Sequence, residues 1–425
     1  MIGRRGGIAA SAADDVLFQS RQRGHALDRT MSWIFIPFEV LAIALALSVL
    51  VLFVEILAGC LHEKWHVPVR GERPRVVVLI PAHNEGLGIT PTINDIRPQL
   101  RPGDRLLVIA DNCNDDTAEV ALANGAEVIR RNDTRNRGKG FALDFGLRGL
   151  AMEDPDIVIV IDADCRVDSR AIDVLASVCA ATRRPVQARY LMSAPAGATV
   201  NHQIAEFAWR IKNDLRPRGL HAFGLPCQLM GSGMAFPRRA LESVKVASGH
   251  LTEDLELGLL LASSGQAPLF CPAAHVTSVF PLTKDAARSQ RQRWEHGHLA
   301  ILIKRVCPMI GRALIERDVD LLALSLDVAV PPTVLLILLT MVVTMVNGTA
   351  AVLGGGWVGV YVGCATLFAL VAAILMAWNA RGRDLITRSS LRAIGPYLAA
   401  KAGIYVRAFA REKAWVRTTR GGGHG

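Results

Sequence analysis

Residues 157–165 read IVIVIDADC, a run of five β-branched residues followed by two aspartates one residue apart. A short continuous apolar run is typical of a strand buried on both faces of a parallel sheet. Asp162 and Asp164 can both turn toward a ligand if this strand ends in a bend. Oxygen ligands of this kind suit Mg²⁺ or Mn²⁺ held together with substrate phosphates. An ordinary turn after a strand would also explain the two aspartates.

Similar apolar runs lie before this one and alternate with helical patterns. We predict strands at 75–80, 105–110, 126–130 and 157–161 and helices at about 117–124 and 140–152. This alternation indicates an α/β domain with a mostly parallel sheet. Polar residues follow the first two strands directly, as His83-Asn84-Glu85 and Asp111-Asn112. Ligands bind at the carboxyl ends of strands in open α/β sheets, so the site is expected there.

Two common nucleotide-binding signatures are missing from this arrangement. The chain has no G-x-x-x-x-G-K-[ST] phosphate loop, and Gly86 and Gly88 lack a third glycine because position 91 is Pro91. A dinucleotide dehydrogenase and a P-loop NTPase are therefore disfavoured. The Asp111 carboxylate could instead accept hydrogen bonds from the N–H groups of a base, although an Asx turn is the simpler explanation.

Cationic residues recur at two predicted helices. Arg137-Gly138-Lys139-Gly140 starts one helix, where the dipole favours anions, but a solvated loop would look the same. Gln290, Arg293 and Trp294 have i, i+3, i+4 spacing and would share one helix face. An arginine fork can hold a diphosphate and an indole can support a sugar ring. A basic interfacial helix with a tryptophan is the alternative.

Thr252-Glu253-Asp254 opens another apolar helical stretch. A carboxylate here could act as a general base that removes the proton of an attacking hydroxyl. The alternative is a cap in which the acids stabilise the helix N-terminus.

The composition predicts a membrane protein, with 51% apolar residues and no charged residue from Val328 to Ala380. That stretch fits two spans, with a turn predicted at Asn347-Gly348-Thr349, and a further span is expected near 32–61. Glu39 and Glu55 are expected near the two interfaces of that span, or as an intramembrane carboxylate on a substrate path.

Most of the net charge of +10 lies after residue 380, where the net charge is +8. Basic flanks stay on the cytoplasmic side. The C-terminus and the region of about 62–325 are therefore expected in the cytoplasm, and the N-terminus outside. The basic tail is interleaved with apolar residues, which favours an interfacial helix over nucleic-acid binding. Eight scattered cysteines without metal-site spacing are expected to be reduced thiols.

Residues 74–300 resemble the membrane-integrated inverting glycosyltransferases of family 2, which have the GT-A fold and include cellulose, chitin and hyaluronan synthases. Four ordered motifs carry the resemblance: IPAHNE at 80–85 with Asp111 after it, DAD at 162–164, TED at 252–254 and QRQRW at 290–294. The resemblance implies a metal-dependent hexosyltransferase type of enzyme that uses Mg²⁺ or Mn²⁺.

The resemblance also implies roles for individual residues. Asp254 would be the catalytic base, with Glu253 beside it, and Asp164 would bind the metal. The implied donor and nucleotide-binding residues are Pro81, Ala82, Glu85, Asp111, Lys139, Asp162, Gln290 and Arg293. The implied acceptor-binding residues are Trp294 and the small-residue loop of Gly231, Ser232 and Gly233.

These features predict transfer of a sugar from a nucleotide-sugar, expected to be a UDP-sugar, to a growing β-linked glycan in polysaccharide synthesis. Only two clear spans follow the catalytic region, so export would need a homo-oligomer or a separate exporter. A single addition to a polyprenyl-linked saccharide is the alternative within enzymes, and an inert nucleotide-sugar-binding subunit is the alternative outside them. The expected location is a bacterial-type inner membrane, in contact with lipids.

The expected organisation has seven segments. They are an N-terminal segment at 1–31, a span at 32–61, the GT-A domain at 62–283, interfacial helices with QxxRW at 284–325, spans at 326–347 and 350–380, and a basic amphipathic tail at 381–425.

Overall fold

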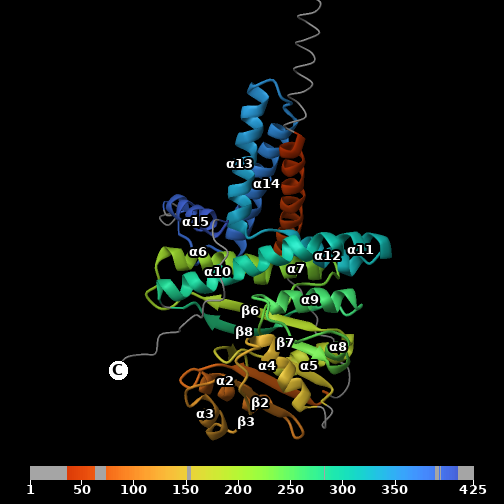
Figure 1. Cartoon of the computed structure of the whole chain (residues 1–425), viewed down its shortest axis with the longest axis vertical. Coiled ribbons are helices and arrows are strands. Elements are labelled where there is room, and N and C mark those ends of the chain that lie inside the picture. The colour runs from red at the N-terminus through yellow and green to blue at the C-terminus, as the bar shows by residue number, and fades with distance from the viewer. Residues whose placement is uncertain are drawn as a thin grey trace, which may run out of the picture. The chain divides into compact units, whose positions relative to one another are not determined.

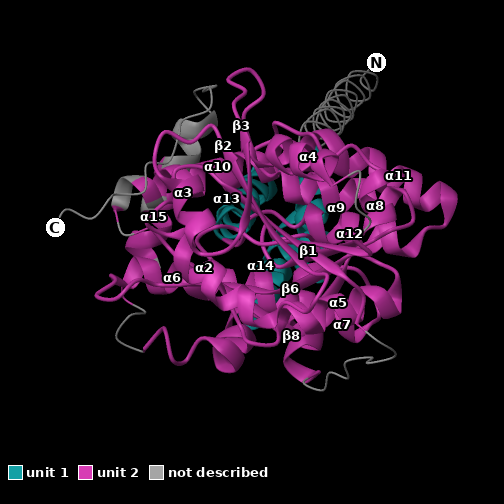
Figure 2. Cartoon of the chain, turned by 90° about the horizontal axis from the view of Figure 1, so that it is seen from below, with its two compact units in different colours: residues 1–50, 334–372 teal, residues 51–333, 373–425 magenta. Residues whose placement is uncertain are grey.

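The computed structural model describes residues 36–62, 73–150, 155–281, 283–387, 392 and 394–409. The N-terminal segment at 1–31 and residues 388–391, 393 and 410–425 of the basic tail lie outside these residues. Figure 2 shows the two compact units of the chain, residues 1–50 with 334–372, and residues 51–333 with 373–425. The larger unit contains every predicted site residue.

Eight strands of the larger unit form one mixed sheet in the order β3-β2-β1-β4-β7-β6-β8-β5. The strands are β1 (Val76–Ala82), β2 (Arg105–Asp111), β3 (Glu127–Arg131), β4 (Ile157–Val160), β5 (Arg166–Val167), β6 (Val186–Ser193), β7 (Met234–Pro237) and β8 (Leu269–Val279). The first four are mutually parallel, as their sequences predicted, and β6 pairs in parallel with β8. The later strands β5 and β7 add the antiparallel pairs.

Helices cover both faces of the sheet (Figure 1). Alternate residues of β1 accordingly pack into two different apolar cores. Val76, Val78 and Ile80 pack with α2 (Ile89–Ile96) and α5 (Ala171–Thr182). Val77 and Leu79 pack with residues of other helices. These are α4 (Lys139–Gly149), α8 (Arg238–Glu242) and α9 (Glu253–Ser263). This two-sided burial explains why the strands read as continuous apolar runs.

The described parts of the larger unit also contain shorter and peripheral helical segments. They are η1 (Arg97–Gln99), α3 (Thr117–Ala123), α6 (Val200–Arg210), η2 (Ile211–Leu215), α7 (Arg216–Ala222), α10 (Lys284–Ile301), η3 (Leu302–Val306), α11 (Cys307–Glu316), α12 (Val319–Ala329) and α15 (Ile394–Phe409). From α6 to α7 the chain is one continuous helical run that contains the π-helix η2. Lys401 of α15 forms an ion pair with Glu295 of α10, so this part of the predicted tail packs on α10 within the larger unit.

Three helices in the described part of the chain are long and apolar enough to cross a membrane. They are Ile36–Leu61, α13 (Thr333–Val352) and α14 (Val358–Arg381). The number agrees with the prediction, but the predicted turn at 347–349 is wrong. Asn347 lies inside α13, and its amide donates to the carbonyl oxygens of Val343 and Phe38. The chain reverses instead at residues 353–357, where Gly354 has φ of +97°.

Glu55, predicted near an interface, is buried in the larger unit. Its carboxylate accepts a hydrogen bond from Arg216 Nε at 2.6 Å, and Arg216 also forms an ion pair with Asp327 of α12. These three side chains, each nearly inaccessible to solvent, form a buried charge cluster. They join the helix Ile36–Leu61 to α7 and α12.

Two glycines allow the close approach of backbones beside this cluster. A Cβ at Gly219 would collide with the carbonyl oxygen of Glu55, and one at Gly59 would collide with the carbonyl oxygen of Leu215. Glycine at both positions therefore permits the helix Ile36–Leu61 to pack directly on the η2–α7 segment.

We expect Gly219→Ala to lower the free energy of unfolding by about 2 kcal/mol or more, because overpacking against a backbone atom cannot be relieved by a side-chain rotation. Thermal unfolding of the detergent-solubilised full chain measures the loss. Gly311→Ala in α11 is the control, since a Cβ there has no neighbour within 4 Å and alanine favours a helix. Equal stability of the two variants would contradict this packing argument.

Candidate active site

A first cavity of about 720 Å³ lies at the carboxyl ends of β1 and β2. It is lined by Pro81, Ala82, His83, Asn84, Glu85, Asp111, Asn112, Cys113, Asn114, Asn132, Thr134, Arg137, Gly138, Lys139, Ala142, Gln290 and Arg293. All eight predicted donor-binding residues except Asp162 line it. The sheet register explains why, since Ala82 of β1 pairs with Ala110 of β2 and the two polar segments leave the sheet together.

Asp111, the last residue of β2, is held in place by Arg131 of β3 and by the residues that follow β1 and β2. Its Oδ1 accepts from Arg131 Nη1 at 2.6 Å and from Asn112 Nδ2 at 2.9 Å, while its backbone oxygen lies 2.6 Å from His83 Nδ1. Asn84 and Asn112 have φ values of +55° and +52°, a conformation that asparagine tolerates better than most residues. The polar edge of this cavity is therefore fixed by both side chains and backbone.

A second cavity of about 540 Å³ is lined by residues from a different part of the sheet. Its lining includes Asp162, Asp164, Tyr190, Trp209, Lys212, Asn213, Gln228, Gly231, His250, Thr252, Glu253, Asp254, Trp294 and His298. It shares Arg137, Gly138, Lys139, Gln290 and Arg293 with the first cavity. The two cavities are thus neighbours divided by these five residues.

Lys139 lies at this division. Its Nζ donates to Asp162 Oδ1 and, at 2.6 Å, to the backbone oxygen of Gly231. Burial would lower the pKa of Lys139, but the charges of Asp162, Glu253 and Asp254 outweigh burial and raise it. Lys139 therefore remains a cation between the two cavities.

Asp162 and Asp164 project at the end of β4 together with Cys165. One ligand atom from each of the three lies within 4.8 Å of the others. Asp164 Oδ2 accepts from Ser278 Oγ at 3.2 Å. Desolvation, and the nearby charges of Asp162 and Asp164, raise the pKa of the Cys165 thiol well above its usual value. The neutral thiol leaves the two carboxylates as the oxygen donors that Mg²⁺ and Mn²⁺ prefer, so the residues fit such an ion.

Glu253 and Asp254 begin α9 and face the second cavity. Desolvation, followed by the charge of Asp254, raises the pKa of Glu253 to about 7, although Lys139 opposes the shift. A Cβ on Gly231 would lie 3.4 Å from Asp254 Oδ2, which places this carboxylate beside the Gly231 loop. The Thr252 hydroxyl forms no cap to this helix, so the predicted capping role does not apply to that side chain.

The chain matches a family model described as "Glycosyltransferase like family 2" over residues 74–297, more than half of its length. The chain belongs to this glycosyltransferase family. Its eight-stranded mixed sheet, together with this match, confirms the predicted GT-A fold class.

Two named relatives are similar to parts of this glycosyltransferase. "Probable glycosyltransferase YdaM" of Bacillus subtilis is 26% identical over 259 residues, which cover 57% of this chain and 59% of the relative. A glucosyl-3-phosphoglycerate synthase of Mycobacterium tuberculosis is 31% identical over 208 residues, 44% of this chain and 60% of the relative. The matches thus span about three-fifths of these relatives.

Two solved structures are also similar. The mannosyltransferase PcManGT from Pyrobaculum calidifontis, in complex with GDP-Man and Mn²⁺, has a TM-score of 0.49 and 18% identity over 87% of this chain and 99% of that chain. The M. tuberculosis glucosyl-3-phosphoglycerate synthase with Mn²⁺ and UDP-Glc has a TM-score of 0.37 and 25% identity, covering 55% and 82%.

Within the glycosyltransferase, the small-residue loop has two parts. Gly231 lines the second cavity with φ of +95°. Ser232 and Gly233 are not in the lining of either cavity. Ser232 is fully buried, and its Oγ accepts from the backbone N–H of Asp162 at 3.0 Å. The loop therefore supports the Asp162 backbone from behind, and acceptor binding by Ser232 and Gly233 stays a prediction.

Trp294 stacks on an aromatic cluster that the sequence did not reveal. The rings of Trp294 and Trp209 have centroids 4.8 Å apart, and Tyr190 and Phe280 each meet Trp209 edge-on at 6.0 Å. Trp209 and Lys212 are far from every recognised motif in the sequence, whereas Arg131 lies six residues before Arg137 and His298 lies four residues after Trp294.

Proposed function

We propose that this glycosyltransferase binds a nucleotide-sugar, expected to be a UDP-sugar, in the first cavity. It transfers the sugar with inversion to an acceptor hydroxyl in the second cavity. The observation that carries the proposal is the pair of adjoining cavities with Lys139, Gln290 and Arg293 between them. Asp162 and Asp164, the carboxylates for a metal, line the second cavity together with Glu253 and Asp254.

Each step follows from the chemistry of these side chains. Asp111 and its asparagine neighbours present hydrogen-bond acceptors and donors to the base. Arg293 and Lys139 stabilise the negative charge that grows on the leaving diphosphate. Asp254 removes the proton of the attacking hydroxyl, and attack from the side opposite the diphosphate inverts the anomeric carbon. Asp164, with Asp162, would hold a divalent ion that neutralises diphosphate oxygens when bound.

The relatives support the metal and the donor class in this proposal. The two solved structures contain Mn²⁺ together with GDP-Man or UDP-Glc. The relatives do not share one sugar, so the donor of this chain has to be measured.

We also propose that the chain is an integral protein of a bacterial-type inner membrane with its catalytic unit in the cytoplasm. Three candidate spans and the basic residues after α14 support this orientation. In this location the acceptor is a growing β-linked glycan, and a homo-oligomer or an exporter would carry the product. A lipid-linked saccharide that receives one sugar is the alternative acceptor.

A donor screen tests the function. Purified full-length protein in detergent is incubated with UDP-, GDP- and dTDP-sugars and Mg²⁺ or Mn²⁺, and the released nucleoside diphosphate and the glycan mass are measured. Release from one donor with a ladder of products supports a polymerising enzyme. One added sugar only with a lipid acceptor supports the alternative, and no release from any donor overturns the proposal.

We expect activity to fall below about pH 7, because Glu253 then holds a proton and the acceptor cavity loses one negative charge. In Glu253→Gln this acidic limb of the pH profile should be absent, because the group whose pKa is about 7 has been removed. The measurement is the pH profile of kcat/KM for both proteins.

The same group also affects stability. The pKa of Glu253 in the folded chain, about 7, exceeds the ordinary value of 4.5, so the unfolded chain loses this proton at a lower pH than the folded chain does. This contribution to stability is full below about pH 4.5 and is lost as the pH rises through 7.

An acidic limb that stays in place in Glu253→Gln would remove Glu253 from the ionisation that controls activity.

A further inference from the structure

Four polar atoms of residues that line the second cavity are buried and have no hydrogen-bond partner among the described residues. They are Asn213 Oδ1, Gln228 Oε1, Thr252 Oγ1 and His298 Nε2. Their side chains belong to residues that are at most 9% exposed. An unpaired buried polar group costs about 1–3 kcal/mol, and these four atoms belong to the walls of one cavity.

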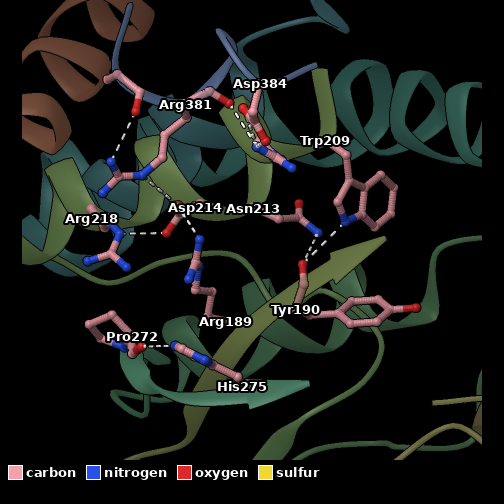
Figure 3. A network of polar contacts seen from close by, with 12 residues as sticks. Arg189, Tyr190, Trp209, Asn213, Asp214, Arg218, Pro272, His275, Arg381 and Asp384 are labelled. Carbon is pink, nitrogen blue, oxygen red and sulfur yellow. Dashed lines mark hydrogen bonds and ion pairs between the residues drawn. The ribbon is translucent and has the colours of Figure 1, made fainter. Parts of the chain in front are cut away.

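Asn213 lies on the π-helix η2, which a buried network holds in place (Figure 3). The fully buried Asp214 accepts hydrogen bonds from Arg189 at 2.9 Å, Arg218 at 2.5 Å and Arg381 at 3.3 Å. These arginines come from β6, α7 and the end of α14. Short π-helices occur often at functional sites because the additional residue re-aims its neighbours.

On η2 the residues beside Asp214 are turned toward the second cavity. Asn213 Nδ2 and Trp209 Nε1 both donate to the backbone oxygen of Tyr190 at 3.2 Å (Figure 3). Lys212 and Asn213 both line the cavity. The network around Asp214 therefore fixes the part of the helix that presents these two residues.

Lys212 is exposed to the cavity, and no hydrogen bond or ion pair joins it to another described residue. Desolvation by the surrounding protein lowers the pKa of its ammonium group, the charge of Asp254 raises it, and Arg216 lowers it again. An ammonium group placed in this way gains more from an anionic ligand than one in bulk water.

We propose that Lys212 binds an anionic group, a phosphate or a carboxylate, on the acceptor. The inference rests on the proposed function and adds a charge to its acceptor. Lys212 does not line the first cavity, where Lys139 and Arg293 already serve the diphosphate of the donor. Its place in the second cavity therefore assigns it to the acceptor.

The two sources of the anion are an acidic sugar and a lipid phosphate, and three probes separate them. Dissociation constants are measured for methyl β-glucoside, methyl β-glucuronide and farnesyl phosphate, using the full-length protein in detergent with UDP and Mn²⁺. We expect one anionic probe to bind about tenfold or more tightly than the neutral glucoside, because a charged hydrogen bond contributes about 1.5–3 kcal/mol. The preferred probe names the source.

The variants test whether Lys212 is responsible. Lys212→Met should remove the preference for the anionic probe, and Lys212→Arg should retain it to within about threefold. Lys245→Met is the matched control, because Lys245 is exposed and lines neither cavity. Equal binding of the neutral and anionic probes by the wild-type protein, or equal losses for all three probes in Lys212→Met, would overturn the inference.

A parallel measurement separates this inference from the proposed function. UDP and GDP binding with Mn²⁺ is measured for the wild-type protein and for Lys212→Met. Nucleotide binding without any anion preference leaves the glycosyltransferase function intact and removes the role of Lys212. Failure of both nucleotides to bind, together with no release in the donor screen, refutes the function instead.

Discussion

Asp254→Asn should reduce sugar transfer by about 10³-fold while the dissociation constant of the donor changes by less than about twofold. A positioned general base contributes about 10²–10⁴ to a rate, and asparagine has nearly the same shape but cannot accept the proton. Asp254 lines the second cavity and not the first. Its loss should therefore lower kcat and leave the nucleotide pocket unchanged. The measurement pairs turnover with equilibrium binding of the nucleotide.

Glu253 is the competing candidate for the base, so Glu253→Gln is measured beside Asp254→Asn. Asp144→Asn serves as a control, since Asp144 lies on α4 outside both cavities and pairs with Arg148. If Asp254→Asn retains a tenth or more of the activity while Glu253→Gln loses it, Glu253 is the base. If neither substitution matters, proton removal is not performed by the carboxylates of α9.

The second large effect is expected from Asp164→Ala, which should weaken metal-dependent donor binding by about 100-fold. A divalent ion bridging protein and diphosphate needs carboxylate oxygens, and Asp164 supplies one beside Asp162. Titration of the protein with Mn²⁺, followed by electron paramagnetic resonance, reports the loss of metal without requiring turnover. Donor binding is then measured with and without the metal.

Asp168→Ala is the matched control for this experiment. Asp168 is four residues away and exposed, and its carboxylate lies 3.0 Å from His275 Nδ1. It should bind metal and donor like the wild-type protein. Unchanged Mn²⁺ affinity in Asp164→Ala would remove Asp164 from the metal site and would leave the carboxylate of Asp162 to be tested next.

The parallel half of the sheet was predictable because its information is local. The strands β1, β2 and β4 are largely apolar runs, and the predicted boundaries of the four parallel strands lie within two residues of the observed ones. The donor side of the site follows from the same strands, since Glu85 and Asp111 come directly after them. The motifs at Asp164, Asp254 and Arg293 could also be found, because their residues are close in sequence.

The acceptor side was less predictable because contacts between distant segments build it. Trp209 meets Trp294, which is 85 positions later, and Lys212 reaches the cavity through a π-helix that has no recognisable sequence signal. Neither residue stands next to a motif. Local spacing could therefore identify the catalytic carboxylates but not the surroundings that an acceptor would meet.

The misplaced turn at 347–349 has a similar origin. Asparagine followed by glycine usually favours a turn. Here Gly359 and Gly363 of α14 let that helix approach Asn347 and Thr344 of α13 closely, and the Asn347 amide finds acceptors within the packed helices. Small residues at helix interfaces are common in membranes. Packing between helices thus overrode the local preference.

The buried cluster of Glu55, Arg216 and Asp327 also bears on how the chain is made in the cell. Burying a charge without its partner costs several kcal/mol. A slip of one helical turn, about 5.4 Å, would carry Glu55 away from Arg216 and leave unpaired charges in the interior. Only the correct alignment of the helix Ile36–Leu61 pairs all three groups, so a chain docked out of register would be less stable and more open to proteolysis.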